Sequence, residues 1–290
     1  MPYKKTPTAV QLWTLRKEVA EDLPGTLKKV GEIGYQGVEL WFERWPPAAP
    51  LKQALADANL KVAAAHVELA DLLADFARIA DYHRELGNTT LVVPIIPDPL
   101  KLTADDWRRI ADELSRVADD ARRAGFRFAY HHHDFEFKAK VGDVEVHDFL
   151  FAAVNSRMKN GAGSERRDDL PSSSRDREVP VPIFHPPQAE ERMQAEIDVF
   201  FPTEMGRDPA ALIRKFAGRV PLVHFKDKSP PGSRFRSIEL GRGVIDWDTV
   251  LTACEAAGVE WYIVEQNCED KPALDCIRAS FEFLRGKGVV

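Results

Sequence analysis

Ionisable side chains gather in one short stretch of the sequence, FRFAYHHHDFEF at residues 126–137. An apolar run ends there in three consecutive histidines, at 131–133, and Asp134 and Glu136 follow among phenylalanines. Burying so many ionisable groups costs free energy unless they are paired, hydrogen-bonded or bound to an ion. Imidazoles and carboxylates are also the most frequent general acids and bases of enzymes. The stretch is therefore a candidate site for catalysis or for metal binding.

Four other apolar runs end in the same residue types. His66 ends KVAAAH, Asp198 lies in AEIDVFF, His224 and Lys226 lie in VPLVHFKDK, and Glu265 follows WYIV. Each alone has an ordinary explanation, such as a helix cap for an aspartate or a hydrogen-bonded core position for a histidine. If the runs end at one place, the mixture suits one divalent cation, with Mn, Mg, Co and Zn as the candidates. The alternative is a polar network that holds no metal.

The elements that would position these residues alternate between strands and helices. Eight short apolar runs are typical of strands buried on both faces, and segments with helical periodicity separate them, one from the capping Thr103 to the terminating Gly125. This alternation predicts an α/β fold, a single-domain (β/α)8 TIM barrel over residues 1–290, in which the C-terminal strand ends face the active site. A doubly wound open sheet is the runner-up, but no GxGxxG or GxxxxGK(S/T) motif follows a predicted strand. The predicted strands are 9–13, 37–41, 61–66, 90–94, 126–131, 193–199, 220–225 and 261–265.

One segment, at about residues 157–192, interrupts the alternation. It is rich in Pro, Ser, Arg and Asp without a regular period, which predicts a mobile insertion, either a solvated segment or a lid, rather than a second domain. The 290-residue chain has a formal net charge of −6 and no long basic block, which disfavours a nucleic-acid partner. No uncharged apolar run approaches the ~18 residues of a membrane span. Three cysteines without metal-type spacing fit a reduced, cytoplasmic compartment.

Several motifs, taken in order, carry a family resemblance. VQLWTLR, IGYQGVELW, YHHHDFEF, EIDVFF, HFKDK and VEQN resemble the sugar phosphate isomerase/epimerase family of xylose-isomerase-like barrels, over nearly the whole chain except 157–192. The resemblance implies one divalent metal held by a Glu, an Asp, a His and a second Glu from separate strands. Asp198, His224 and Glu265 match three of these positions. Many relatives have a Glu where this chain has His131, so the fourth ligand is open between His131 and Glu136, and we favour Glu136.

The same resemblance implies a reaction. A metal-dependent isomerase or epimerase of a sugar, keto-sugar or cyclitol would abstract a proton next to a carbonyl and pass through an enediolate. Dehydration or β-elimination of a keto-sugar or inosose on the same site is the alternative. His133 is the first candidate for the general acid/base and Glu265 the second. No anion-binding loop is readable, which favours a substrate without phosphate. Substrate contacts are expected from His66, His131, Lys226 and Trp13, with Trp41 and Phe201 completing an apolar wall.

Two other classes of function compete with this hypothesis. An endonuclease for abasic DNA would need several metals, more ligands and a basic face. The net charge of −6 disfavours this function. A non-catalytic sugar-binding or partner subunit would keep the metal without turnover. The expected partner is a small-molecule sugar or cyclitol, with neither nucleic acid nor membrane, and a homo-oligomer stays open.

Overall fold

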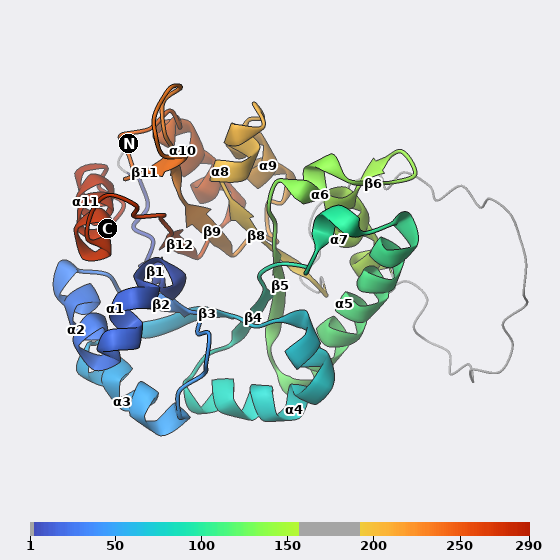
Figure 1. The fold of residues 1–290 in the computed structure, drawn as a ribbon, viewed down its shortest axis with the longest axis horizontal. Coiled ribbons are helices and arrows are strands. Elements are labelled where there is room, and N and C mark those ends of the chain that lie inside the picture. The colour runs from blue at the N-terminus through green and yellow to red at the C-terminus, as the bar shows by residue number, and fades with distance from the viewer. Residues whose placement is uncertain (1–2, 157–191) are drawn as a thin grey trace, which may run out of the picture.

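Eight parallel strands form a closed barrel in the computed structural model, which describes residues 3–156 and 192–290. The barrel order is β1-β12-β9-β8-β5-β4-β3-β2, and helices surround it (Figure 1). The predicted (β/α)8 TIM barrel is confirmed, with a strand at each of the eight predicted places. The barrel strands are β1 (Thr8–Gln11), β2 (Gly37–Leu40), β3 (Lys61–His66), β4 (Thr90–Val93), β5 (Arg127–His131), β8 (Gln194–Asp198), β9 (Leu222–Phe225) and β12 (Trp261–Val264).

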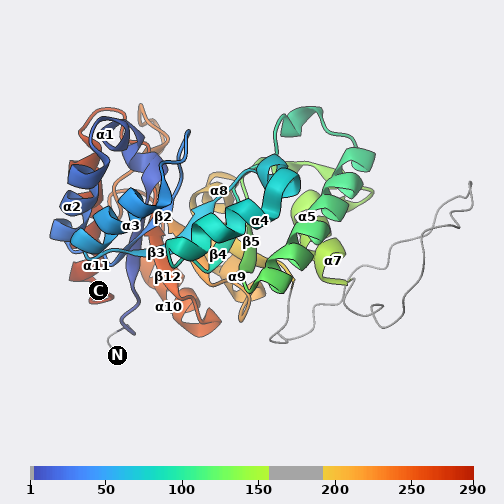
Figure 2. The ribbon, with the colours of Figure 1, turned by 90° about the horizontal axis from the view of Figure 1, so that it is seen from below.

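Helices follow the strands and pack around the outside of the barrel. Figure 2 shows α5 and α7 together at one end of the molecule and α2 with α11 at the other. The longest, α5, begins at a capping box between Thr103 and Asp106 and ends at Gly125, as its sequence predicts. The helices are η1 (Leu12–Leu15), α1 (Arg16–Glu21), α2 (Leu23–Ile33), α3 (Ala48–Asp57), α4 (Leu69–Glu85), η2 (Pro99–Lys101), α5 (Ala104–Ala124), α6 (Phe135–Lys138), α7 (Val146–Ser156), α8 (Phe200–Glu204), α9 (Pro209–Lys215), α10 (Trp247–Ala257) and α11 (Ala273–Gly286).

Two small hairpins lie outside the barrel. One joins β6 (Lys140–Val141) to β7 (Val144–Glu145), and the other joins β10 (Asp227–Lys228) to β11 (Ser237–Ile238). The predicted insertion at about 157–192 lies outside the described residues except for Arg192. In the described part of the chain, no helix combines the length and hydrophobicity that a bilayer crossing requires.

The strand register places the polar side chains of the barrel interior. His131 on β5 pairs with Glu196 on β8, and Asp198 on β8 pairs with His224 on β9. Because alternate side chains of a strand point to the same face, the residue two positions further along lies one layer higher in the barrel. The lowest layer is apolar and consists largely of small residues, and the layers above it are polar. That apolar cluster is Ala9, Ala63, Ala64, Val92, Ala129, Leu222 and Ile263.

A buried histidine outside the barrel makes the fold sensitive to acid. His83 on α4 packs edge-on against Trp45 and Tyr82, and burial lowers its pKa to about 4. The unfolded chain takes up this proton near pH 6.5, whereas the folded chain resists it until about pH 4. The contribution of His83 to stability is therefore fully present above about pH 6.5 and is lost as the pH drops toward 4.

Replacing His83→Gln is expected to flatten this dependence. Between about pH 7 and about pH 5, wild type should lose about 2 kcal/mol more unfolding free energy than the variant. Urea unfolding at several pH values measures the difference. Parallel curves for the two proteins would contradict this role of His83.

Candidate metal centre

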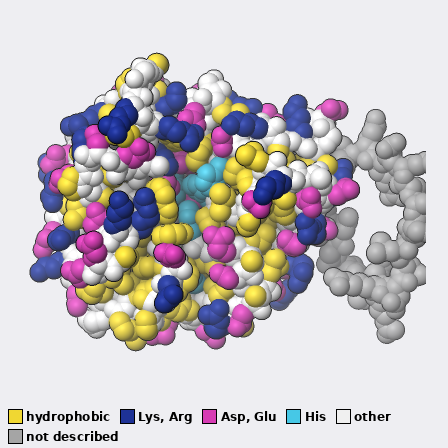
Figure 3. Space-filling view, viewed as in Figure 1, with side chains coloured by type: hydrophobic (Ala, Val, Ile, Leu, Met, Phe, Trp, Pro, Cys, Tyr) yellow, Lys and Arg dark blue, Asp and Glu magenta, His cyan; other side chains and the backbone are white. Residues whose placement is uncertain are grey.

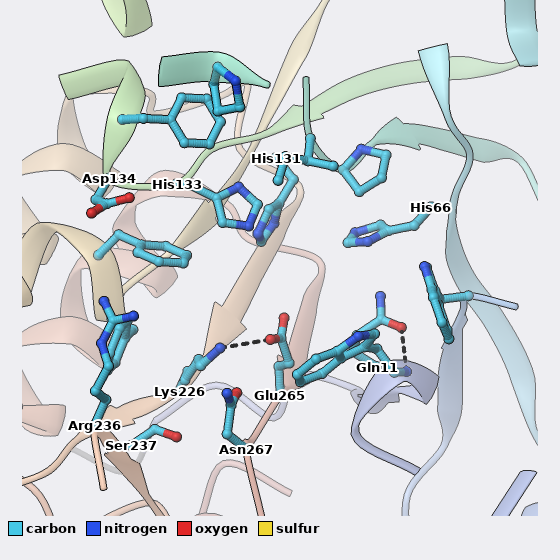
Figure 4. Close-up of a pocket in the computed structure, with 18 of the residues that line it drawn as sticks. Gln11, His66, His131, His133, Asp134, Lys226, Arg236, Ser237, Glu265 and Asn267 are labelled. Carbon is cyan, nitrogen blue, oxygen red and sulfur yellow. Dashed lines mark hydrogen bonds and ion pairs between the residues drawn. The ribbon is translucent and has the colours of Figure 1, made fainter. Parts of the chain in front are cut away.

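A cavity of about 720 Å³ opens at the C-terminal end of the barrel. Figure 3 shows histidine side chains in a hollow near the middle of this face. Trp13, Trp41 and Phe201, for which the sequence predicts an apolar wall, all line the cavity. Figure 4 labels part of its polar lining: Gln11, His66, His131, His133, Asp134, Lys226, Arg236, Ser237, Glu265 and Asn267.

An outer group of ligand-type residues lies at the floor of this cavity, where His131 and Glu265 line it and Asp198 and His224 are completely buried. It consists of His131, Asp198, His224 and Glu265, and one ligand atom from each lies within 4.8 Å of the others. His224 Nδ1 is 2.9 Å from Glu265 Oε2, and Lys226 Nζ donates to Glu265 Oε1 at 2.8 Å. These residues come from the ends of four different barrel strands, as the sequence predicts for a convergent site.

One oxygen of the Asp198 carboxylate has no hydrogen-bond partner. Its Oδ1 accepts a hydrogen bond from the Phe200 amide at 2.8 Å, whereas its Oδ2 is buried and has no partner. Burial raises the pKa of Asp198 to about 7. Burial acts the same way on Glu265, but Lys226 and His224 outweigh it and hold the pKa of Glu265 well below its usual range. An unpaired buried carboxylate oxygen beside two imidazoles fits a cation, because a cation compensates the buried charge.

A second layer of acidic residues lies directly beneath the outer group. Glu196 Oε2 is 2.9 Å from His131 Nδ1 and 2.7 Å from His66 Nε2, and Glu39 Oε2 is 2.6 Å from His224 Nε2. Both glutamates are completely buried. Burial and repulsion from Glu196 raise the pKa of Glu39 to about 7. We call Glu39 and Glu196 the inner pair.

Glu136 does not join the outer group. It lies on α6, where its Oε1 accepts from Tyr130 Oη at 2.6 Å and its Oε2 accepts from the His133 amide at 2.8 Å. The one-turn helix folds the carboxylate back beneath the end of β5 instead of turning it toward the cavity. Among the described residues, the structure thus brings His131, and not the favoured Glu136, together with Asp198, His224 and Glu265.

The three consecutive histidines have different surroundings. His131 and His133 line the cavity, as strand alternation predicts, and His132 is buried against Phe137 and His147. His133 packs between Phe135 and Phe201, and its Nδ1 has no hydrogen-bond partner. Burial, reinforced by the neighbouring His131, holds the pKa of His133 well below its usual range. The imidazole is therefore neutral near pH 7 and has a nitrogen that can accept a proton.

Sequence reasoning missed three residues of the site floor, Gln11 and the inner pair. A signal for two of them was present, because Glu196 is two positions before Asp198 on the same strand and Glu39 lies in the motif GVELW. Period-two alternation from the predicted ligands would have placed Glu196 on the barrel interior. Arg236, Ser237 and Asn267 were missed as well, since they reach the cavity from loops and a hairpin rather than from strand ends.

Comparisons with known proteins find similarity in structure only. No protein-family model and no curated protein matches the sequence. A sugar phosphate isomerase/epimerase from Parabacteroides distasonis is similar, with a TM-score of 0.71 and 18% identity over 98% of this chain and 94% of that one.

Two further structures have more specific descriptions. A D-allulose 3-epimerase from Methylomonas sp. has a TM-score of 0.65 and 12% identity, covering 99% of this chain and 100% of that one. A probable 3-DHS dehydratase from Bacillus anthracis has a TM-score of 0.68 and 11% identity, covering 96% and 98%. The strong structural neighbours of this barrel are thus sugar phosphate isomerase/epimerase and xylose-isomerase-like TIM barrel proteins, as the sequence motifs predict.

Proposed function

We propose that the protein is a divalent-metal-dependent isomerase or epimerase of a free sugar, keto-sugar or cyclitol. The observation that carries the proposal is the outer group, in which two imidazoles and two carboxylates from four strand ends meet at the floor of the cavity. Structural neighbours described as sugar isomerases and epimerases support it. The proposed reaction is the removal of a proton next to a carbonyl, through an enediolate.

The donor set fits one divalent cation. His131, Asp198, His224 and Glu265 offer nitrogen and oxygen ligands without cysteine, a set that suits Mn²⁺, Mg²⁺, Co²⁺ or Zn²⁺. When bound, such a cation would polarise the carbonyl and hydroxyl oxygens of a sugar. We propose His131 rather than Glu136 as the fourth ligand, because Glu136 already accepts two hydrogen bonds away from the cavity.

The remaining residues of the cavity would bind the sugar and move the proton. His133 lines the cavity with an imidazole that is neutral near pH 7, so we assign it the proton transfer, with Glu265 as a second base. The Lys226 ammonium lies beside Glu265 and would stabilise negative charge that develops on the substrate oxygen. Trp13, which lies beneath Lys226, would shield one face of the sugar ring from water.

Elimination is the second candidate for this site. If the proton abstraction is followed by loss of a β-hydroxyl, the same residues perform a dehydration. The structural neighbour described as a probable 3-DHS dehydratase favours this candidate. Isomerisation or epimerisation conserves the mass of the substrate, whereas elimination releases water, so mass spectrometry of the product distinguishes the two.

Deuterium exchange tests the proposal without knowledge of the natural substrate. The cation-loaded protein is incubated in D₂O with a panel of ketoses, keto-sugars and inososes, and we expect deuterium to enter the carbon next to the carbonyl of at least one of them. Removing the cation with a chelator should stop the exchange. His133→Gln should slow it by about 10²- to 10⁴-fold while keeping the cation. Cation retention without exchange on any sugar would instead favour the non-catalytic sugar-binding or subunit role.

A further inference from the structure

Beneath the proposed ligands, two buried carboxylates face three imidazoles. The Oε2 atoms of Glu39 and Glu196 lie against ring nitrogens of these imidazoles, and Glu39 Oε2 also accepts a hydrogen bond from Gln11. Glu196 Oε2 meets His131 Nδ1 at 2.9 Å and His66 Nε2 at 2.7 Å. Glu39 Oε2 meets His224 Nε2 at 2.6 Å. The outer group uses none of these oxygens.

We propose that Glu39 and Glu196 are positioning residues that fix which ring nitrogen of His131 and His224 carries the proton. This inference rests on the proposed function, because it concerns how the chain prepares its metal ligands. An imidazole that binds a cation is neutral and has one N–H and one lone pair, so when its lone pair faces the cation its N–H faces the carboxylate on the other side. The nitrogens that face the inner pair, His131 Nδ1 and His224 Nε2, therefore carry hydrogen. His131 Nε2 and His224 Nδ1 are left as lone pairs for a cation.

A series of hydrogen bonds that starts at the backbone determines which ring nitrogen of His224 is the donor. The Trp13 amide donates to Gln11 Oε1 at 3.0 Å, so the side-chain amide of Gln11 must turn its Nε2 donor toward Glu39. The hydrogen bond that Gln11 Oε1 accepts is drawn as a dashed line in Figure 4. Gln11 Nε2 donates to Glu39 Oε2 at 2.7 Å, which marks that oxygen as an acceptor. The same oxygen meets His224 Nε2, which must then be the donor.

The opposite nitrogen of His224 faces a proposed ligand of the outer group. His224 Nδ1 lies 2.9 Å from Glu265 Oε2, another acceptor. At this distance His224 Nδ1 can donate a hydrogen to Glu265 Oε2 as long as no cation is bound, and a cation that binds both atoms would take the place of that hydrogen. Carboxylates that orient metal-binding histidines in this way raise the basicity of the imidazole and strengthen metal binding.

The rival explanation is a cation bound inside the barrel by the inner layer itself. His66, His131, Glu196 and His224 also offer ligand atoms within 4.8 Å of one another. A neutral imidazole has only one lone pair, so His131 and His224 cannot bind a cation on both sides at once. The contact from Gln11 through Glu39 favours the outer side, since it supplies His224 with a hydrogen-bond acceptor on the inner side.

Nitrogen NMR of ¹⁵N-histidine-labelled protein loaded with Zn²⁺ tests the inference in wild type, without any substitution. We expect His224 with its proton on Nε2 and His131 with its proton on Nδ1. Protons on the opposite nitrogens, His224 Nδ1 and His131 Nε2, would overturn the inference even if the protein binds zinc and turns over sugars. Failure of wild type to bind any cation would instead overturn the proposed function.

Zn²⁺ affinity of variants supplies the second readout. Glu39→Gln and Glu196→Gln should each weaken binding by about 10- to 100-fold while one binding site per chain remains. Gln11→Met should weaken it less, since it removes only a donor to Glu39. Glu239→Gln is the matched control, because Glu239 is a buried carboxylate that bonds Lys271 and has no contact with the inner pair. Two results would overturn the positioning role. One is an unchanged Zn²⁺ affinity in both inner-pair variants. The other is a Glu196→Gln protein that binds no Zn²⁺ together with an Asp198→Asn protein that binds it normally.

Discussion

The Asp198→Asn variant is expected to lose the bound cation and about 10³-fold of its turnover, which corresponds to about 4 kcal/mol of transition-state stabilisation. Asparagine keeps Oδ1, and with it the hydrogen bond from the Phe200 amide that shapes the start of α8. It replaces Oδ2, the buried oxygen without a partner, by an amide NH₂ that repels a cation. The loss should therefore appear in metal content and kcat/KM and leave the fold intact.

The chain contains a matched control for this substitution. Asp208 also accepts from the amide two residues further on, that of Ala210, at 2.8 Å, but it lies at the start of α9, outside the site. Asp208→Asn should keep both the cation and the turnover. Metal analysis after gel filtration and the exchange assay in D₂O measure the two effects. An Asp198→Asn protein that binds the cation as tightly as wild type would remove Asp198 from the ligand set.

The barrel itself was accessible from the sequence because its strands are short apolar runs between helices with clear ends. Thr103 and Gly125 define α5 through a local cap and a left-handed C-terminal residue, and both features depend on neighbouring residues alone. The strand-end residues Asp198, His224 and Glu265 were found for a similar reason. The topology of a barrel brings all C-terminal strand ends to one face, so their convergence follows once the fold is predicted.

The inner pair depends on contacts between distant parts of the chain, and the position of Glu136 depends on the turn that follows β5. Glu39 and Glu196 lie in the middle of apolar strands, where a carboxylate is acceptable only because imidazoles from other strands surround it. At Glu136 the alternation of β5 has already ended, and the chain has turned into α6. Whether this turn directs the carboxylate inward or back depends on the hydrogen bond from Tyr130 Oη, which no local pattern reveals.

Substitutions at His131 and Glu136 should separate cation binding from stability. His131→Gln removes a neutral ring nitrogen from the outer group, and we expect cation affinity to fall by at least about 100-fold, because losing a ligand should cost no less than losing its supporting contact. Glu136→Gln leaves the outer group complete. It removes an oxygen that accepts either Tyr130 Oη or the His133 amide, so we expect a loss of about 1–3 kcal/mol in unfolding free energy.

The two measurements are made on the same preparations, with titration calorimetry for the cation and urea unfolding of the cation-free protein for stability. Unfolding without the cation is essential, because a bound ion stabilises the folded state by mass action and would mix the two effects. We expect weak cation binding for His131→Gln, and near-normal cation binding with reduced stability for Glu136→Gln. If Glu136→Gln instead loses the cation and His131→Gln keeps it, then Glu136 is the fourth ligand. In that case α6 must unwind when the cation binds, since its carboxylate would have to leave Tyr130 and the His133 amide to reach Asp198 and His224.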